Sequence, residues 1–394
     1  MDLSSNPVLE IKQEEIGEKY CCQTMELSNS NLTAITSPIS VSGKSVYSTP
    51  VAYMPVSYFD CWGEFMLDGV YPFYCLLKDS DLLGRKFTIV CKESSRVYIH
   101  SWGKICQLLQ TLFNPVEIFQ TGHLSYTVFP TVYRCKDVES LSFFHTDERG
   151  RQIQSNLKLR FKEFGVVDNE ILSAGQHTSS QLQSFIAYVV EKYGESATQP
   201  VDRLMTITER RGTRRIMNTD EIKKIFIEQG YLVEVVDFGT MSVKQQISQM
   251  RRSQYLLGNY GSNLLNGIFL PRNLTEDVGV IVCWPPDSKI FFSRRYSIIH
   301  SAIIALGISV YEVDKTSYEA RDTYARLNIP DPSGYTYREG TAVKLHDKYR
   351  NHDSIMADPL PAHYDLLDVN FNVVETDIHG VIQRLSSKQN LVQL

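Results

Sequence analysis

The sequence predicts an α/β protein with two lobes, each organised around a parallel sheet. Three apolar, β-branched runs of strand length lie at 204–208, 231–237 and 255–258, and a segment with helical spacing follows each of them. Strands that alternate with helices in this way form parallel sheets. The same alternation recurs on a smaller scale at 86–129. A chain of 394 residues with 43% hydrophobic content is long enough to bury two cores.

Composition and charge narrow the classes of function. The formal net charge of −5 disfavours a general nucleic-acid-binding protein. The eight cysteines include no C-x-x-C spacing, so they predict reduced thiols, with neither a zinc site nor a disulfide framework. Residues 1–20 are acidic without an apolar run, and no later run approaches a membrane span. We therefore expect a cytoplasmic protein without a membrane span, or one of the secretory lumen if an N-terminal anchor is missing from this chain.

The first part of the chain is polar and then becomes strongly apolar. Residues 1–50 are rich in serine and predict a polar extension with one edge strand at most. Residues 58–78 predict a buried helix, in which Pro72 marks a kink or the start of a new turn. Glu64 and Asp68 lie four residues apart on one face of that helix. Two buried carboxylates are unfavourable without partners, so this pair is either catalytic or satisfied by backbone donors or an arginine.

The remaining elements follow in order along the chain. Helical spacing predicts helices at 99–113, 182–193 and 378–385. Further strands are expected at 87–91, 116–120, 126–130, 278–284 and 308–313. The chain then divides into the extension at 1–50, an N-terminal α/β lobe at 51–198 and a C-terminal α/β lobe at 199–394. The last helix is a candidate to return to the N-terminal lobe.

Two loops of the C-terminal lobe carry special chemistry. The loop at 209–218 contains four arginines within six positions: Arg210, Arg211, Arg214 and Arg215. The loop at 259–263 places Gly261, Ser262 and Asn263 at the start of a helix. Both loops follow strands of a parallel sheet, whose carboxyl ends are the usual place for ligands. Guanidinium groups and free backbone N–H groups both suit a phosphate or diphosphate, because each offers several donors to clustered anionic oxygens.

Each of these residues also has a plainer interpretation. The arginines could form a solvated face, and Gly261 could serve only a tight turn. Asn218 with Glu221 has the spacing of an N-cap and its N3 partner. Ser242 with Gln245 has the spacing of a capping box. The histidines show no metal-ligand spacing, so no metal site is expected.

Four segments of the chain carry motifs in a recognisable order and spacing. They are CWGEFMLDGVYP at 61–72, Arg210 and Arg214 followed by Asn218 and Glu221, Ser242 with Gln245, and the loop at 260–271. In these segments, along about half of the chain, the sequence resembles glycosyltransferase family 61. The family's patterns are N-x-x-H-x-x-x-D-x-x-x-P, two arginines with N-E-x-E, S-x-x-Q, and H-G-A/S-x-L-x-N-x-x-F-L-P. The sequence departs from these patterns at Thr219, where the first glutamate usually stands, at Cys61 for asparagine, and at Glu64 and Tyr260 for histidine.

The resemblance implies a fold, a reaction and a set of site residues. The fold is GT-B-like, with two Rossmann-like lobes facing a cleft. The reaction is inverting transfer of a sugar, without a divalent metal or other cofactor, from a nucleotide-sugar such as UDP-linked N-acetylglucosamine or a pentose to a hydroxyl of a glycan or glycoprotein. Donor binding falls to Arg210, Arg214, Asn218, Glu221, Tyr260, Gly261, Ser262 and Asn263. Glu64 is the expected general base and Asp68 the competing choice.

Two other classes of function compete with this one. A catalytically inactive nucleotide- or sugar-binding protein on the same fold is the alternative. A nucleotide-dependent phosphotransferase or dehydrogenase is disfavoured, because neither G-x-G-x-x-G nor G-x-x-x-x-G-K-[ST] occurs where those chemistries require it.

Overall fold

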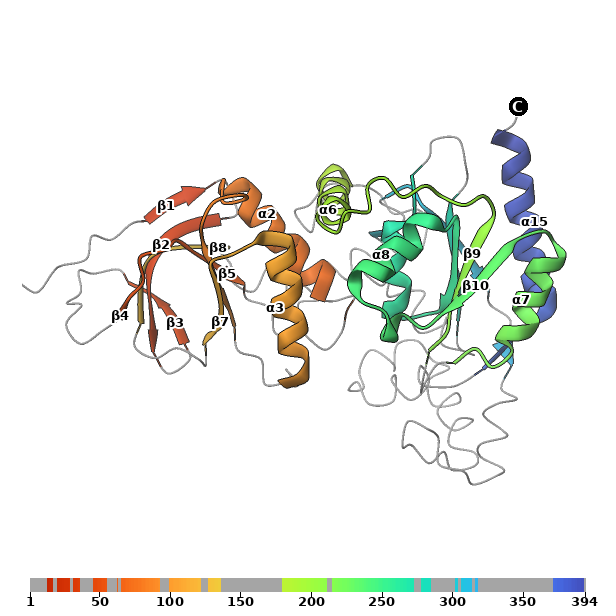
Figure 1. The fold of residues 1–394 in the computed structure, drawn as a ribbon, viewed down its shortest axis with the longest axis horizontal. Coiled ribbons are helices and arrows are strands. Elements are labelled where there is room, and N and C mark those ends of the chain that lie inside the picture. The colour runs from red at the N-terminus through yellow and green to blue at the C-terminus, as the bar shows by residue number, and fades with distance from the viewer. Residues whose placement is uncertain are drawn as a thin grey trace, which may run out of the picture. The chain divides into compact units, whose positions relative to one another are not determined.

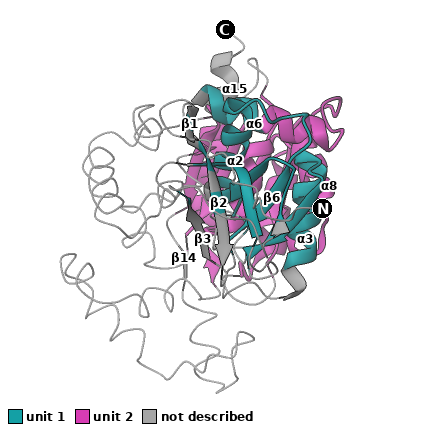
Figure 2. Ribbon diagram, turned by 90° about the vertical axis from the view of Figure 1, so that its left-hand side faces the viewer, with its two compact units in different colours: residues 1–154, 174–185 teal, residues 155–173, 186–394 magenta. Residues whose placement is uncertain are grey.

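The fold is described from a computed structural model, in two compact units. The described residues are 13–16, 20–28, 31–35, 45–54, 62, 65–92, 99–121, 127–135, 179–210, 215–272, 278–284, 302–303, 306–313, 316–317 and 371–392. Unit 1 comprises residues 1–154 and 174–185, and unit 2 comprises residues 155–173 and 186–394 (Figure 2). The division therefore falls inside helix α6 (Ser179–Lys192), earlier in the chain than the linker that the sequence predicts.

Unit 1 contains a mixed sheet with a parallel centre. Its parallel strands are β5 (Val51–Met54), β6 (Thr88–Cys91), β7 (Glu117–Gln120) and β8 (Thr127–Cys135). They lie in the order β8-β5-β6-β7, and β5 pairs in parallel with both β6 and β8. The chain therefore moves outward from β5 to β7 and then returns to the other side of β5. The predicted strands at 87–91, 116–120 and 126–130 are confirmed, the last one extending to Cys135.

The N-terminal stretch contributes strands to the same sheet. These are β1 (Gln13–Ile16), β2 (Tyr20–Ser28), β3 (Asn31–Ala34) and β4 (Ser45–Val46). The antiparallel partner of β8 is β2, so residues 1–50 hold more than the single edge strand expected from their polar composition. An antiparallel strand needs only one apolar face, and Cys22 and Met25 supply buried side chains here. Composition alone therefore does not predict such a strand.

The helices of unit 1 pack together through aromatic side chains. A π-helical turn, η1 (Phe65–Val70), leads into α2 (Tyr71–Asp79). Pro72 lies in the first turn of α2, where its missing N–H breaks no helical bond, as the prediction of a new turn requires. Phe73 contacts Phe113 of α3 (Ile99–Phe113) at 5.4 Å between ring centroids. Tyr71 contacts Phe185 of α6 at 5.3 Å.

Unit 2 contains a fully parallel five-stranded sheet. Its order is β10-β9-β11-β12-β13, and every neighbouring pair is parallel. The strands are β9 (Leu204–Thr208), β10 (Leu232–Val236), β11 (Tyr255–Asn259), β12 (Gly279–Cys283) and β13 (Ser309–Val313). All five predicted strands of the C-terminal lobe are confirmed. Together with unit 1, this gives an α/β protein with two parallel-rich sheets.

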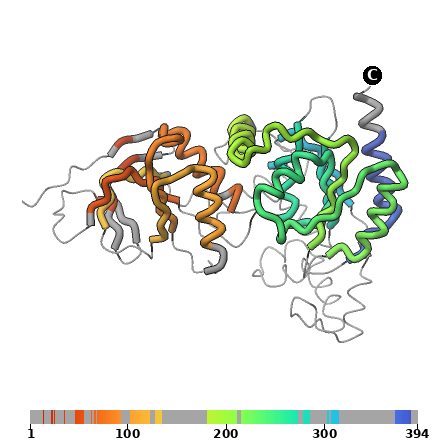
Figure 3. Tube along the Cα trace, in the orientation of Figure 1, coloured from red at the N-terminus to blue at the C-terminus, as the bar shows by residue number. Residues whose placement is uncertain are grey.

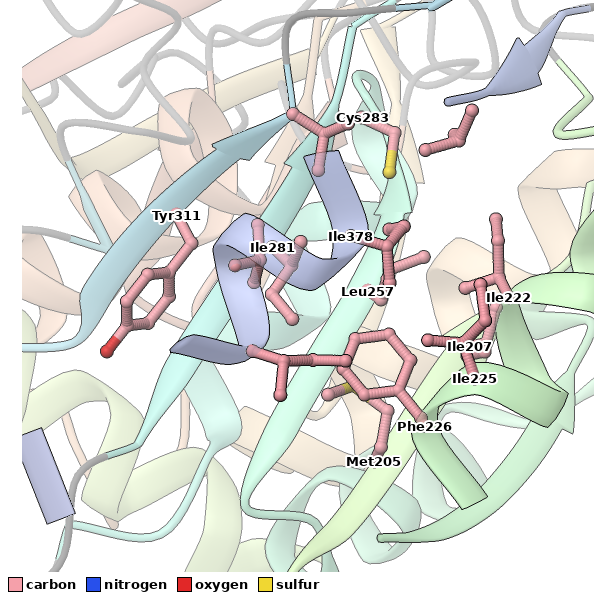
Figure 4. Packing of buried hydrophobic residues seen from close by; sticks show 14 of the residues in the cluster. Met205, Ile207, Ile222, Ile225, Phe226, Leu257, Ile281, Cys283, Tyr311 and Ile378 are labelled. Carbon is pink, nitrogen blue, oxygen red and sulfur yellow. The ribbon is translucent and has the colours of Figure 1, made fainter. Parts of the chain in front are cut away.

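Helices cover both faces of the unit 2 sheet (Figures 1 and 3). On one face lie α7 (Thr219–Glu228) and α15 (Glu375–Val392), and on the other lie α8 (Val243–Arg252) and the 3₁₀ turn η4 (Ser262–Phe269). In the alternating pattern of β9, Met205 and Ile207 face the first pair of helices. Figure 4 shows Ile378 of α15 beside Leu257 and Ile281 in this core.

The last helix packs within unit 2. Ile378, Val381 and Leu385 of α15 are fully buried in the same apolar cluster as Phe226 of α7. The contacts of α15 with β13 and α7 place it on the sheet of unit 2. Before α15 the chain forms β15 (Asn372–Val373), which pairs with β14 (Thr316–Ser317). Among the described residues, no helix has both the length and the apolar character of a membrane span.

Candidate functional site

The sheet of unit 2 has a topological switch point between β9 and β11. From β9 the chain crosses first to β10 on one side and later to β11 on the other side. The loops after two such strands lead away in opposite directions, and open α/β sheets bind ligands at this position. Residues 209–218 follow β9, and residues 259–263 begin at the last residue of β11. These are the two loops that the sequence analysis selected.

The loop after β9 is held at both of its ends. At its start the N–H of Glu209 donates to the carbonyl oxygen of Val236, 2.7 Å away. Near its end the N–H of Phe371 donates to the carbonyl oxygen of Arg215 at 2.9 Å, and Ile216 forms a parallel bridge with Phe371. The guanidinium of Arg215 also forms an ion pair with Glu209 at 3.7 Å. Backbone bonds thus fix where this loop leaves and re-enters the folded unit.

The loop after β11 has a backbone geometry that suits an anion. Gly261 has φ 154° and ψ −177°, a region that residues with a Cβ rarely adopt. The turn η4 begins directly after it, and its first hydrogen bond runs from the N–H of Leu264 to the carbonyl oxygen of Gly261 at 3.0 Å. The N–H groups of Ser262 and Asn263 therefore precede the first bond within the turn. Such groups are the usual donors to a phosphate.

A side-chain contact joins the two loops. Nδ2 of Asn263 donates to Oγ1 of Thr208, the last residue of β9, at 3.4 Å. The close approach of the two strand ends depends on Gly258, because a Cβ there would lie 2.2 Å from Cγ2 of Thr208. Thr208 was not among the predicted site residues. The signal that could have found it is a hydroxyl at the carboxyl end of a buried strand.

Tyr260 lies between the glycine turn and the next strand. Its N–H donates to the carbonyl oxygen of Cys283 at 2.9 Å, and its ring stacks on Trp284 with a centroid distance of 4.3 Å and an interplanar angle of 17°. Trp284, which follows β12 directly, is buried and was also missed by the sequence analysis. Burial raises the pKa of the Cys283 thiol, which favours the protonated form of this neighbour.

Asn218 and Glu221 lie where the chain enters α7. Asn218 is the N-cap residue by position, but its side chain makes no capping bond. Instead, its Nδ2 donates to the carbonyl oxygen of Val373 at 2.8 Å, and the N–H of Val373 donates to its Oδ1 at 2.9 Å. Glu221 is exposed in the first turn of α7, where a carboxylate interacts favourably with the helix dipole.

Not every predicted donor-binding residue is described. Arg210 is described at the start of the loop after β9, whereas Arg211 and Arg214 lie outside the described residues. Gly261, Ser262 and Asn263 are brought together in one turn, and Asn263 connects that turn to β9.

Unit 1 has a switch point of its own, between β5 and β8. The strand β6 lies on one side of β5 and β8 on the other. The stretch that follows β5 carries both predicted carboxylates. Glu64 lies outside the described residues, and Asp68 belongs to η1 by its backbone, while its side chain lies outside the description. In the sequence, the two candidate bases thus follow β5, the strand that borders the switch point of the unit 1 sheet.

In the part of the chain that the structure describes, no three side chains of histidine, cysteine, aspartate or glutamate are grouped to hold a metal ion.

Comparison with known proteins gives one result that covers both candidate regions. A family model described as Glycosyltransferase 61 matches residues 62–276. The match begins just after β5, includes η1, and continues through both loops of the unit 2 switch point to the end of η4. A comparison with curated proteins finds no match.

Proposed function

Because the chain belongs to glycosyltransferase family 61 and is therefore a glycosyltransferase, we propose that it transfers a sugar from a UDP-sugar, with inversion and without a divalent metal. The donor is UDP-linked N-acetylglucosamine or a UDP-linked pentose, and the acceptor is a hydroxyl of a glycan or glycoprotein. The observation that carries this proposal is the pair of loops at the unit 2 switch point, joined by the contact between Asn263 and Thr208.

The donor diphosphate would bind at these two loops. On one side, Arg210 and Arg214 would supply guanidinium donors from the loop after β9. On the other side, the N–H groups at the start of η4 would supply backbone donors next to Gly261. Both kinds of group stabilise the negative charge that develops on the departing diphosphate. In the absence of a metal ion they would carry that charge stabilisation alone.

The transfer step exchanges one bond at the anomeric carbon. The acceptor oxygen attacks C1 of the sugar from the face opposite the diphosphate, so that a new C1–O bond forms while the bond from C1 to the phosphate oxygen breaks. The bonding electrons leave with the diphosphate. The acceptor proton passes to Glu64, with Asp68 as the other candidate, because a carboxylate in an apolar segment has a raised pKa and becomes a better base.

We further propose that the two units are the two lobes of a GT-B enzyme. Unit 2 carries the candidate diphosphate-binding groups, and unit 1 carries the candidate bases. Each unit has a parallel-rich sheet with its own switch point, which is the usual location for binding groups in an open α/β sheet.

Binding of UDP tests the donor site directly. We expect wild-type protein to bind UDP in calorimetry equally well with and without EDTA. Arg210→Ala should weaken UDP binding by about 1.5–3 kcal/mol, because a charge-assisted hydrogen bond to the diphosphate is lost. Arg85→Ala is the matched control, since Arg85 pairs with Asp81 on the surface of unit 1. Its UDP affinity should equal that of wild type.

A panel of UDP-sugars tests the reaction. Release of UDP from one sugar, with or without a glycan acceptor, would identify the donor. Loss of UDP binding in EDTA would contradict metal independence. UDP binding without turnover of any UDP-sugar would contradict the proposed donors, and unchanged UDP affinity in Arg210→Ala would remove that arginine from the site.

A further inference from the structure

Both polar atoms of the Asn218 side-chain amide form hydrogen bonds with the backbone of Val373, a residue far away in the sequence. Its Nδ2 donates to Val373 O at 2.8 Å and its Oδ1 accepts from Val373 N–H at 2.9 Å, across 155 positions of the chain. An asparagine amide offers a donor and an acceptor side by side, so it can pair with both polar groups of a peptide residue. Asn218 therefore acts here as an additional strand partner.

Backbone bonds extend this pairing toward the arginine loop. The N–H of Met217 donates to the carbonyl oxygen of Phe371 at 2.8 Å, and the N–H of Phe371 donates to the carbonyl oxygen of Arg215 at 2.9 Å. With Asn218 added, residues 215–218 are held by residues 371–373 through four hydrogen bonds. These residues form the last part of the loop that carries the candidate phosphate-binding arginines.

The partner segment is itself firmly anchored. Phe371 and Val373 are 0% and 3% exposed, and both belong to the apolar cluster of unit 2. The segment continues directly into α15, which fills the same cluster with Ile378, Val381 and Leu385. Residues 215–218, the last part of the loop, are thus held by the core of the sheet through the C-terminal segment.

We infer that Asn218 is a positioning residue for the donor: by clamping the backbone of Val373, it makes the C-terminal segment 371–392 a support of the diphosphate-binding loop. This assigns Asn218 to the backbone of Val373 instead of direct contact with the nucleotide. The inference rests on the proposed function, because it takes the loop after β9 as the diphosphate site.

Three variants of the full chain test it with UDP as the probe. Asn218→Ala removes both bonds and should weaken UDP binding at least tenfold at a temperature where the protein remains folded. Hydrogen exchange at the Met217 and Phe371 amides should become faster in the same variant. Met250→Ala is the matched control, because Met250 is fully buried at the end of α8, just before β11 begins, on the face of the sheet opposite α7 and α15. It should lower Tm while leaving UDP affinity unchanged.

Asn218→Asp provides a readout that a general loss of stability would not produce. An ionised carboxylate still accepts from Val373 N–H but faces Val373 O without a donor, so the pKa of the introduced carboxyl should be raised. Once protonated, it regains an O–H donor and matches the amide. The ratio of Kd for this variant to Kd for wild type should therefore fall toward one as the pH is lowered from 8 to 5.

Val373→Pro separates positioning from direct contact, because it removes the N–H that Asn218 accepts without changing Asn218 itself. A weaker UDP affinity, non-additive with Asn218→Ala, supports the inference. Unchanged affinity in a folded Val373→Pro, combined with weak binding by Asn218→Ala, would make Asn218 a direct ligand and overturn it. If Val373→Pro does not fold, unchanged exchange at Met217 in Asn218→Ala overturns it equally. Wild-type affinity in Asn218→Ala also refutes the inference, whereas failure of wild type to bind UDP refutes the proposed function.

Discussion

Gly261 and Tyr260 shape the loop after β11 in different ways. The backbone of Gly261 lies in a region that is almost reserved for glycine, which lets the turn η4 start immediately after β11. Tyr260 is held by its N–H on Cys283 and by its ring on Trp284, so the residue before the glycine has little freedom. Together they orient the N–H groups that we propose as phosphate donors.

Substitution of Gly261 should affect both the fold and the ligand. Gly261→Ala places a Cβ at φ 154°, so we expect a loss of stability of about 1–3 kcal/mol, together with weaker UDP binding as the turn shifts. Thermal unfolding and calorimetry would measure the two effects. Gly307→Ala is the control, since Gly307 also has a positive φ (74°) and lies before β13, away from both loops. Equal UDP affinity for the two variants would argue that Gly261 serves only the turn.

At the scale of elements, the connections matter more than the strands. The capping box predicted at the start of α8 is present, with Ser242 Oγ accepting from Gln245 N–H at 3.3 Å and Gln245 Oε1 accepting from Ser242 N–H at 2.8 Å. The similar spacing of Asn218 and Glu221 produces no such box, because Val373 takes up the amide of Asn218. The connection after β5 leads through the π-helical turn η1 into α2. Turns of this kind are frequent at functional sites.

The connection after β5 carries the prediction about the general base. Glu64→Gln keeps size and hydrogen bonding but removes the proton acceptor, so transfer should fall by about 10²–10⁴-fold with UDP affinity retained. Asp68→Asn is measured in parallel under the same conditions. Full activity of Glu64→Gln with loss in Asp68→Asn would assign the role to Asp68. Full activity of both variants would show that neither carboxylate is the general base.

At the scale of the whole molecule, buried ionisable groups make the stability of the folded state depend on pH in the alkaline range. Burial is the main reason that the pKa of Tyr53 rises from 10.0 to about 12, with Cys91 raising it further and Arg134 opposing the shift. Burial likewise raises the pKa of Cys91 in unit 1 and of Cys283 in unit 2. All three groups are neutral when protonated, and the unfolded chain loses these protons at lower pH than the folded chain. Their contribution is therefore complete below the unfolded pKa and is lost as the pH rises toward the folded pKa.

We therefore expect the urea midpoint of unfolding to fall steadily above pH 9. Between pH 9 and 11 Tyr53 alone should account for about 1 kcal/mol of the loss, since most of the unfolded phenol ionises in that range while the folded one does not. The phenylalanine side chain of Tyr53→Phe cannot ionise. The loss of unfolding free energy between pH 9 and 11 should therefore be smaller in this variant by that amount. If the urea midpoint falls equally with pH in wild type and in Tyr53→Phe, then Tyr53 titrates alike in the folded and unfolded states.

The sequence predicted the elements well where hydrophobic periodicity is strong. The five strands of unit 2 and the helix at 99–113 are local patterns, because each strand is rich in apolar and β-branched residues and the helix has a clear apolar stripe. The strand β2 was missed because its sequence mixes polar and apolar residues without an apolar run of strand length, and even Gln23 is buried in it. Trp284 and Thr208 were missed for another reason: each contacts a residue of the loop after β11, Tyr260 for Trp284 and Asn263 for Thr208.

By itself, then, the sequence determined the α/β class, the two loops with phosphate chemistry and the resemblance to a glycosyltransferase family, because these depend on local spacing and residue type. That the two loops flank one switch point becomes visible in the folded chain alone, since strand order is set by pairing between segments far apart in the chain. The same holds for the pairing of Asn218 with Val373 and for the packing of α15 within unit 2. No local pattern contains these facts, because an amide or an apolar stripe does not specify which distant surface will satisfy it.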